Sequence, residues 1–487
     1  MMAENHKINT NKELSIWEAL VPVLALVLIL AFNVYVFKDD ALSGSNQFVL
    51  LLGAAVAAIV GFRNDITYKH MLDVVGSNLK STSGAILILL FVGALAGTWL
   101  VSGIIPTMIY YGLQILHPTI FLPATVVICA IISLATGSSW TTSATVGIAL
   151  IGIGKAIGLP LGMVAGAVLS GAYFGDKMSP LSDTTNLAPA MAGAELFSHI
   201  RYMTYTTVPT IIVTLIIFVI ISLTRETTGV SDSSAILNAI DASFYISPVL
   251  FIVPVIVIIL IVKKTPPLVA LLGGTLLGGV AALIFQPHII LNLSGEETMS
   301  WTAGYKGLMN AITVSSGVET SNADLNDLFT SGGMAGMLGT IWLIICAMVF
   351  GGVMDAIGAL ARISAALLSM AQSTFGLFAS TVASCLALNA TASDQYLALV
   401  VPGKMFEKAY ADRNLAPENL SRTLEDSGTV TSVLIPWNTC GAYQSGVLGV
   451  SVYDYFIYAI FNYLSPFTTL LYAALGIKIK QLSGKLS

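Results

Sequence analysis

Long apolar runs separated by short polar segments dominate this sequence. Four of the runs have the ~17–25 residues needed to cross the hydrocarbon core of a bilayer: 17–37, 203–224, 245–262 and 452–476. Shorter, glycine-rich apolar runs lie at 48–62, 84–101, 267–285 and 337–353. Because a helix satisfies its own backbone hydrogen bonds in lipid, the pattern predicts an all-α polytopic membrane protein.

Composition supports this class. The chain has 487 residues, of which 56% are hydrophobic and 10% are charged, whereas soluble domains carry about 25% charged residues. Residues 1–16 are polar and the first apolar run is too long for the core of a signal peptide, so we expect no cleavable signal. No histidine shows metal-ligand spacing, and the sequence has neither a Walker A motif nor a long basic tract. We therefore expect no enzyme, no cofactor and no nucleic-acid partner.

In each half of the chain, two segments are too polar for ordinary spanning helices but lie between apolar ones. The first half contains 120–153, two apolar arms around a polar stretch at 136–143, and 161–194, which is interrupted at 175–186. The second half contains 375–403, with a polar stretch at 389–394, and 427–450, which is interrupted at 435–441.

Pro180 and Pro436 lie inside two of these interruptions. Proline prevents a continuous helix because it lacks an N–H and clashes with the preceding turn. Backbone that leaves a helix inside a bilayer needs protein or water partners for its polar groups. We therefore predict one re-entrant hairpin (120–153 and 375–403) and one broken transmembrane helix (161–194 and 427–450) in each half.

The two halves match each other weakly at a nearly constant offset of 255 to 256 positions. At 256, Pro180 meets Pro436 and Ser138 meets Asp394, so the polar interruptions correspond. Five crossings in each half, an odd number, make the second half insert upside down. We predict two inverted repeats, 17–224 and 245–476, joined by an outer linker at 225–244.

Lysines and arginines predict the orientation. If both terminal segments, 1–16 and 477–487, are cytoplasmic, sixteen of the 21 basic residues lie in the cytoplasm. The others are Lys38, Lys155, Arg225 and Lys306 in outer loops and Lys177 within the membrane. This bias is the one that the positive-inside rule requires.

Carboxylates inside membrane segments carry the expected chemistry. An ionised aspartate at that depth costs several kcal/mol unless it is paired or ligated, so Asp176, Asp183 and Asp394 are candidates for binding a cation or a proton. Desolvation favours the protonated carboxyl and a bound cation favours the ionised one, so proton and cation compete. That competition is sufficient for antiport. Asp426 and Glu425 lie nearer a helix end and are further candidates.

Hydroxyl, amide and carbonyl oxygens beside these carboxylates are ligands that a small alkali cation prefers. The candidate cation- and proton-binding residues are Asp183, Asp394, Asp176, Ser138, Ser139, Thr142, Ser182, Thr184, Asn186, Asn389, Thr391, Ser393, Asn438 and Thr439. Na⁺ is expected at Asp183 and Asp394, with Lys177 as a charge partner that neutralises Asp176 or replaces the cation in the empty state. Two plainer interpretations stay open: Asp176 and Lys177 could form a structural pair, and membrane hydroxyls often bond to the i−4 carbonyl.

The run GDKMSPLSDTTNLAP at 175–189 resembles the NhaC family of bacterial Na⁺/H⁺ antiporters, as do GALAGTW at 93–99, GGVMD at 351–355 and PWNT at 436–439. The resemblance implies exchange of cytoplasmic Na⁺ for external H⁺ across the bacterial inner membrane by alternating access. It also implies the fold of the wider ion-transporter superfamily, in which a dimer-forming scaffold holds a transport part that moves like an elevator. A homodimer is therefore expected.

The resemblance leaves the substrate open, because relatives of this type exchange malate and lactate with coupled ions, and amino-acid carriers are conceivable. An organic anion normally needs an arginine or a helix N-terminus. None of the four interrupted segments contains an arginine, which favours a cation alone. The alternative is an ion-coupled exchanger of small organic acids or amino acids; a channel is a third class, but paired broken helices suit alternating access.

Overall fold

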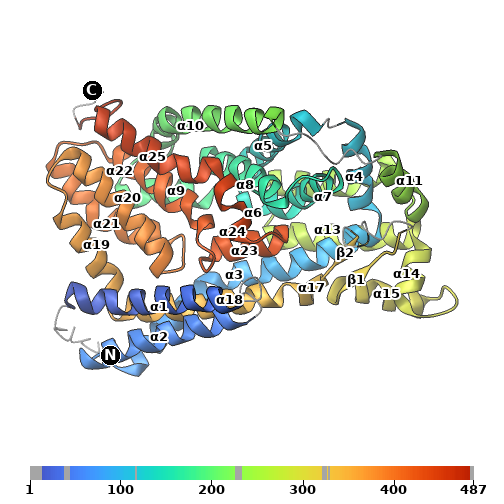
Figure 1. Cartoon of the computed structure of the whole chain (residues 1–487), viewed down its shortest axis with the longest axis horizontal. Helices are drawn as coiled ribbons and strands as arrows, with labels where there is room; N and C mark the ends of the chain where they lie inside the picture. Colours follow the sequence, from blue (N-terminus) through green and yellow to red (C-terminus); the bar gives the residue numbers. More distant parts are fainter. Residues whose placement is uncertain are drawn as a thin grey trace, which may run out of the picture.

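A computed structural model of the chain describes residues 14–37, 44–115, 118–224, 233–320, 326 and 329–482. The molecule is almost entirely helical and elongated (Figure 1). Parts of three predicted segments lie outside the described residues: 1–13 of the N-terminal segment, 225–232 of the outer linker and 483–487 of the C-terminal segment. So do five of the basic residues used for the orientation, Lys7, Lys12, Lys38, Arg225 and Lys485.

Eight helices of the described part are long and apolar enough to cross a membrane. They are α1 (Ile16–Phe37), α2 (Ser45–Arg63), α3 (Tyr68–Val101), α5 (Pro118–Thr136), α10 (Leu196–Thr224), α13 (Pro267–Phe285), α17 with α18 (Gly333–Gly336 and Leu338–Ala356) and α20 (Thr374–Thr391). A further candidate is a pair bent by 84°, α11 (Ser233–Ser243) with η3 (Pro248–Phe251) and α12 (Ile252–Val262). The predicted class, an all-α multi-pass membrane protein, is confirmed.

The first predicted hairpin and broken helix are formed by consecutive helices. Helix α5 ends at Thr136 and is followed by Gly137, whose φ of 69° is the left-handed conformation that glycine adopts at little cost. The chain then returns through α6 (Ser139–Thr142), the π-helix η2 (Ser143–Gly147) and α7 (Ile148–Ala156). The broken helix consists of α8 (Leu161–Met178) and α9 (Asp183–Ala192), with the predicted Pro180 between them.

Close packing fixes the direction of these helices. Gly171 and Gly175 of α8 lie so near α5 that an added Cβ would meet the backbone carbonyls of Val126 and Ala130, respectively. Because the residue number of the contact in α5 increases with the residue number in α8, the two helices run parallel. Gly154 of α7 instead faces Val164, near the start of α8. Helix α7 therefore runs back against α5 and α8, as a hairpin requires.

The second hairpin consists of α20 and α21 (Leu397–Asp412), and it turns at Ser393, which has a φ of 58°. The second broken helix is α22 (Pro417–Leu424), the π-helix η4 (Glu425–Thr429), the short 3₁₀ helix η5 (Ser432–Leu434) and α23 (Thr439–Leu448). Its break contains Pro436. Helix α21 extends to Asp412 instead of the predicted 403, because its exposed Lys404, Glu407 and Lys408 make the last two turns read as a loop in the sequence.

Backbone conformations recur between the halves at the offset found in the sequence. Residues with positive φ pair as Gly103 with Gly358, Gly137 with Ser393, and Gly193 with Gly449. The first pair precedes the short apolar helices α4 (Ile104–Ile115) and α19 (Ala359–Ser369), the second makes the hairpin turns, and the third ends α9 and α23.

Helix α25 (Ile460–Leu475) shows that the broken helices point in opposite directions. It follows α8 in parallel: Gly166 lies against the backbone of Tyr458, and Phe461 N donates to Ser170 Oγ (3.4 Å). It runs opposite to η4, because Asn462 bonds to the Val430 carbonyl and Ser465 to Asp426. Opposed directions are what an inverted repeat requires; the repeats 17–224 and 245–476 stay a prediction.

The predicted apolar helix 452–476 is wrong as a single helix. The structure divides it into α24 (Val452–Tyr455), the 3₁₀ helix η6 (Phe456–Tyr458) and α25. The physical reason is backbone packing: Gly162 and Gly166 let α8 approach the chain at Asp454 and Tyr458, and Ala459, with ψ of 59°, leaves the helix. Apolar composition alone does not reveal such an interruption.

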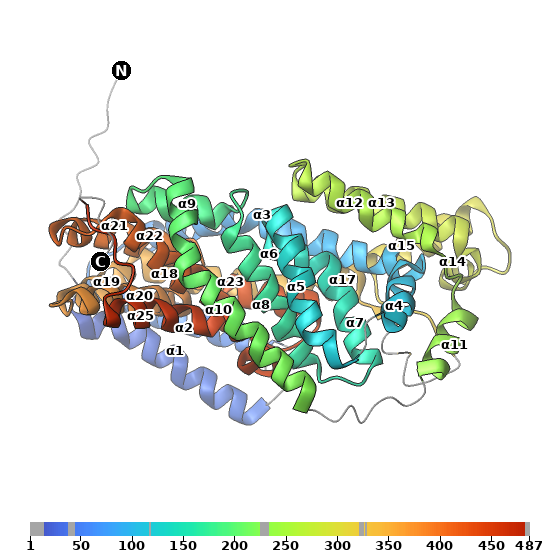
Figure 2. The same cartoon turned by 90° about the horizontal axis from the view of Figure 1, so that it is seen from above.

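The remaining helices support the hairpins. Helices α1, α2, α3 and α18 run side by side along one edge of the molecule in Figure 1, and α18 contacts both α2 and α3. Seen from above, α12 and α13 lie on the side opposite to α1, with α13 packed on α3 (Figure 2). Between α13 and α17 the chain forms α14 (Pro287–Ser294), α15 (Trp301–Thr313) and a small two-stranded sheet, β1 (Ser316–Gly317) with β2 (Thr330–Ser331). None of these three elements was predicted.

Candidate functional site

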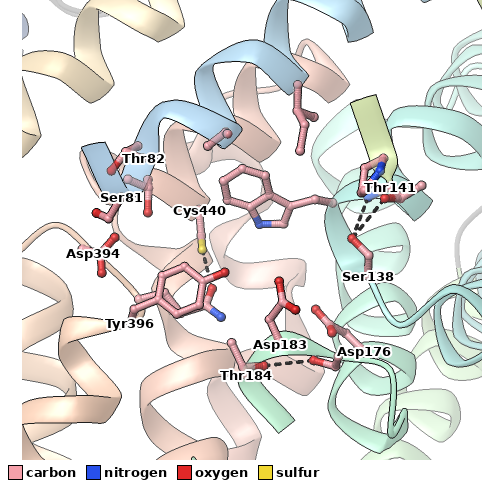
Figure 3. Close-up of a pocket in the computed structure, with 18 of the residues that line it drawn as sticks. Ser81, Thr82, Ser138, Thr141, Asp176, Asp183, Thr184, Asp394, Tyr396 and Cys440 are labelled. Atoms are coloured by element: carbon pink, nitrogen blue, oxygen red, sulfur yellow. Dashed lines mark hydrogen bonds between the residues drawn. The ribbon is translucent and has the colours of Figure 1, made fainter. Parts of the chain in front are cut away.

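Both hairpin tips and both helix breaks border one pocket of about 260 Å³ (Figure 3). The first half contributes residues 137, 138, 140 and 141 at its hairpin tip and 182–184 at its break, with Asp176 beside them. The second half contributes residues 394–396 and 439–440. The remaining wall comes from α3, at residues 81–88, and from Pro267 at the start of α13. The four interruptions found in the sequence therefore meet in space.

Asp176 links the first hairpin tip to the first broken helix. It is buried, and its Oδ2 accepts hydrogen bonds from Ser139 N (3.1 Å) and Ser139 Oγ (2.7 Å). Ser138 caps the short helix after the tip by accepting from Thr141 N (3.2 Å). The carboxylate thus has two donors from the tip and still borders the pocket.

Asp183 is the exposed carboxylate of the pocket. It is the first residue of α9, directly after the cap Ser182, which accepts from Thr185 N (3.4 Å). The Ser182 and Thr184 hydroxyls lie 3.2 Å apart beside it. In Figure 3 Asp183 and Asp176 lie on one side of the pocket.

Asp394 faces them from the second hairpin, near Ser81 and Thr82 of α3 (Figure 3). It is buried, and its Oδ1 accepts from Leu397 N (2.9 Å), so one oxygen caps α21. Asp394 therefore both caps α21 and lines the pocket.

Several predicted residues line the pocket and others hold its walls. Those that line it are Ser138, Asp176, Ser182, Asp183, Thr184, Asp394 and Thr439. The second group consists of Ser139, Thr142, Asn186, Asn389, Thr391, Ser393 and Asn438, which the structure does not place on the pocket surface.

Hydrogen bonds show what this second group does. Asn186 Nδ2 donates to the carbonyls of Pro180 (3.0 Å) and Ser182 (2.7 Å), which satisfies the first break. Asn438 Nδ2 donates to Asn389 O (3.0 Å), and Asn389 Nδ2 donates to Gly428 O (2.8 Å), which joins the second tip to the second broken helix. These residues preorganise the pocket.

The hydroxyls of Thr142 and Thr391 stay within their own helices. Each donates to the carbonyl four residues earlier, Ser138 O (2.9 Å) and Ala387 O (2.8 Å). For these two residues the plainer interpretation, a hydroxyl bonded to its own helix, describes the structure. Ser393 serves through its backbone, since its carbonyl accepts from Thr439 N (3.0 Å).

Lys177 does not pair with Asp176. Consecutive residues of an α-helix point about 100° apart, so Asp176 faces the pocket while Lys177 points away and forms an ion pair with Asp426. Both side chains of that pair are fully buried. The prediction that Lys177 neutralises Asp176 is wrong, because its partner comes from the second broken helix, 249 positions along the chain.

Aromatic and polar residues that the sequence did not single out complete the pocket. Trp140 lines it and stacks on Tyr443, with ring centroids 3.9 Å apart. Gln395, Tyr396 and Cys440 line it from the second half. Their position directly beside Asp394 and Thr439 was the available signal. Ser81 and Thr82 gave none, because α3 begins with a polar stretch that reads as a loop.

The pocket has the chemistry of a cation site. Three carboxylates border it together with serine and threonine hydroxyls, and its lining contains no lysine or arginine. No group of three or more acidic, histidine or cysteine side chains comes together as a metal cluster in the described ranges. A weakly bound monovalent cation with one carboxylate and several neutral oxygens fits this arrangement better than a tightly held divalent ion.

Comparison with known proteins agrees with this chemistry. The model of the Na⁺/H⁺ antiporter family matches residues 171–477. The Na⁺/H⁺ antiporter NhaC of Alkalihalophilus pseudofirmus is 37% identical over 88% of this chain and 90% of its own. A malate-2H⁺/Na⁺-lactate antiporter of Bacillus subtilis is 34% identical over 94% of this chain and 92% of its own. The arginine/ornithine antiporter ArcD of Halobacterium salinarum is 32% identical over 96% and 93%.

Among solved structures, MtrF of Neisseria gonorrhoeae, described as one of a class of antimetabolite efflux pumps, aligns with a TM-score of 0.41 at 13% identity. The alignment covers 93% of this chain and 94% of that one, but the likeness is too low to support a shared function. The sequence relatives are named antiporters and match over almost their whole length. The chain therefore belongs to the NhaC family of Na⁺/H⁺ antiporters and is a secondary transporter, not an enzyme.

Proposed function

We propose that this protein exchanges cytoplasmic Na⁺ for external H⁺ by alternating access of the pocket between the two hairpin tips. The observation that carries the proposal is the lining itself: Asp176, Asp183 and Asp394 face a cavity that contains no basic side chain. Their charge is compensated only when a cation or protons occupy the pocket, because uncompensated carboxylates are costly away from water. Na⁺ and H⁺ are thus alternative occupants.

The position of the pocket supports entry of Na⁺ from the cytoplasm. Ser81 and Thr82 directly follow Lys80, and Pro267 lies close behind Lys263 and Lys264. The positive-inside rule assigns all three lysines to the cytoplasmic side. On this orientation the pocket lies beside the start of α13 and the cytoplasmic end of the apolar part of α3 (84–101), as an inward-facing state requires.

Asp183 is the residue that we expect to couple the two ions. It is the carboxylate most exposed to the pocket, and it is the first residue of α9. A proton and a Na⁺ ion can therefore both reach it. We propose that Asp394 binds from the opposite wall and that Asp176 holds the tip in place.

Everted membrane vesicles with an imposed pH gradient test this function. Addition of Na⁺ should dissipate the gradient, measured as dequenching of a pH-sensitive dye, and Asp183→Asn should abolish the response. Glu407→Gln, which removes an exposed carboxylate from the far arm of the second hairpin, is the matched control and should behave like the parent. Normal exchange by Asp183→Asn would refute Asp183 as the coupling residue.

An organic co-substrate is the second candidate, and the size of the pocket favours considering it. A cavity of about 260 Å³ exceeds what one Na⁺ ion needs, and Trp140 and Tyr396 give it apolar surface. Relatives named for malate and lactate or for arginine and ornithine show that such exchange occurs in similar chains. The acidic lining favours a cationic amino acid, whereas an organic acid would need bound Na⁺ and the N-termini of α9 and α23.

Isothermal titration of the purified protein separates the two candidates. The ligands are Na⁺, malate, lactate, arginine and ornithine, each at two pH values. Na⁺-only exchange predicts heat from Na⁺ alone, larger at the higher pH. Saturable binding of one organic ligand would support the second candidate. The same preparation, examined by mass photometry in detergent, tests the proposed homodimer.

A further inference from the structure

A second polar cluster lies apart from the pocket, buried between α8, α10, η4 and α25. Asp426 is its centre. Its carboxylate accepts hydrogen bonds from Lys177 and Thr469, from Thr206 Oγ1 (2.9 Å) and from Ser465 Oγ (3.3 Å). The charge of Asp426 is therefore matched by Lys177, and both of its oxygens have donors.

Glu425, the preceding residue, has no such partners. Its side chain is completely buried, and neither carboxyl oxygen has a hydrogen-bond partner among the residues that the structure describes. The Thr429 hydroxyl, four residues further along η4, is likewise buried and has no hydrogen-bond partner among the described residues. Arg422, less than one turn earlier, points elsewhere: its guanidinium lies 4.5 Å from the Tyr202 ring, and Nη1 donates to the Lys478 carbonyl (3.3 Å).

An ionised carboxylate in this position would be very unfavourable. Burying an unpaired charge costs far more free energy than the small net stability of a folded protein, so a carboxylate without a partner binds a proton instead. The one ammonium in the cluster, Lys177, already compensates Asp426. The π-helical turn that holds Glu425 is a rare conformation that is often found at functional sites.

Charge in the pocket acts on Glu425, because a short series of neighbouring charged residues lies between them. Glu425 directly precedes Asp426, which pairs with Lys177 of α8, and Lys177 directly follows Asp176. Other titratable groups near η4 are His199 of α10, bonded to Ser421 (2.7 Å), and Cys385 of α20, beside Ser427. Asp176 borders the pocket, so a cation bound there adds positive charge near Glu425. Added positive charge favours the ionised carboxylate and hence release of a proton.

We propose that Glu425 is a proton-binding site, separate from the pocket, whose proton is released when a cation enters the pocket. The assignment of a bound proton stands on the burial of Glu425 and its lack of partners. The coupling to Na⁺ rests on the proposed function.

Infrared spectroscopy of the purified full-length protein tests protonation directly. Without Na⁺ at neutral pH, the parent should show the carbonyl stretching band of a protonated carboxylic acid. Glu425→Gln, which keeps the shape of the neutral side chain, should lose the component of that band that comes from Glu425, seen in the difference spectrum between parent and variant. Glu407→Gln should keep it, and Glu425→Asp should show a shifted band. A band that persists unchanged in Glu425→Gln would overturn the assignment. This result does not depend on whether the protein exchanges Na⁺.

Sodium titrations over a range of pH test the coupling. The slope of log Kd against pH counts the protons released per bound Na⁺, and each proton contributes up to about tenfold per pH unit. Glu425→Gln should still bind Na⁺, but with a slope smaller by up to about one. An unchanged slope would overturn the coupling. If the parent itself shows no Na⁺-dependent proton release, it is the proposed function that fails, and the infrared comparison still decides Glu425.

Discussion

Separating the buried pair Lys177–Asp426 should destabilise the protein strongly, whereas replacing both members should not. Both side chains are fully shielded from solvent, and removing one partner of such a pair costs about 3–5 kcal/mol because the other charge stays buried. Lys177→Met leaves Asp426 with three hydroxyl donors, so its loss should be about 3 kcal/mol. Asp426→Leu leaves Lys177 with one hydroxyl, Ser465 (3.1 Å), so its loss should be about 5 kcal/mol.

The double variant Lys177→Met with Asp426→Leu removes both charges, and apolar replacements of a buried pair are often neutral or stabilising. We therefore expect a coupling energy of at least about 3 kcal/mol in the double-mutant cycle. Tryptophan fluorescence during unfolding in mixed micelles of dodecyl maltoside and SDS measures each loss, since the chain has six tryptophans. Losses that add in the double variant, or single variants that unfold like the parent, would refute the reasoning.

Two further predictions concern packing and the C-terminal segment. In Gly175→Ala the new Cβ would lie 2.6 Å from Leu134 N, so the contact between α5 and α8 must open at a cost of about 1–3 kcal/mol. This variant should unfold at a lower SDS content in the same micelles. Gly339→Ala is the control and should not be destabilised, because nothing lies within 4 Å of its new Cβ. Truncation after Gly476 removes the Lys480 carbonyl, which accepts from Ala416 N (2.9 Å) and Asn419 Nδ2 (2.7 Å). Limited proteolysis of the loop between α21 and α22 should then be faster, while Na⁺ affinity is unchanged. A truncation after residue 482 is the control. If both truncated proteins are cleaved at the same rate, residues 477–482 do not hold this loop in place.

Local signals predicted the breaks and the tips. Pro180 and Pro436 lie in polar stretches, whereas prolines in apolar runs, such as Pro209, stay inside helices. A polar stretch inside an apolar segment must gather partners, so the breaks could be found without tertiary information. Asp183 and Asp394 were found for the same reason, and the structure places both on one pocket. The expectation that they bind Na⁺ stays a prediction.

Partners distant in the chain could not be found in this way. The ammonium of Lys177 has a carboxylate beside it in sequence, Asp176, but helical geometry turns the two apart, and the partner Asp426 comes from the other half. The lining by Ser81 and Thr82 depends on how α3 packs against the hairpins. Periodicity describes one helix at a time, so it gives no information on which helix faces a pocket.

The wall that α3 contributes differs from the other walls. Ser81 Oγ (2.7 Å) and Thr82 Oγ1 (3.0 Å) both donate to Asn78 O of their own helix, and a Cβ on Gly84 would meet nothing within 4 Å. The tips and breaks, by contrast, are braced against one another by the contacts of Ser139 and Asn438. The tips and breaks therefore form one rigid unit, and the wall that α3 contributes offers little resistance to sliding of this unit. Displacement of the unit along α3 would sever few polar contacts and carry an enclosed ion with it.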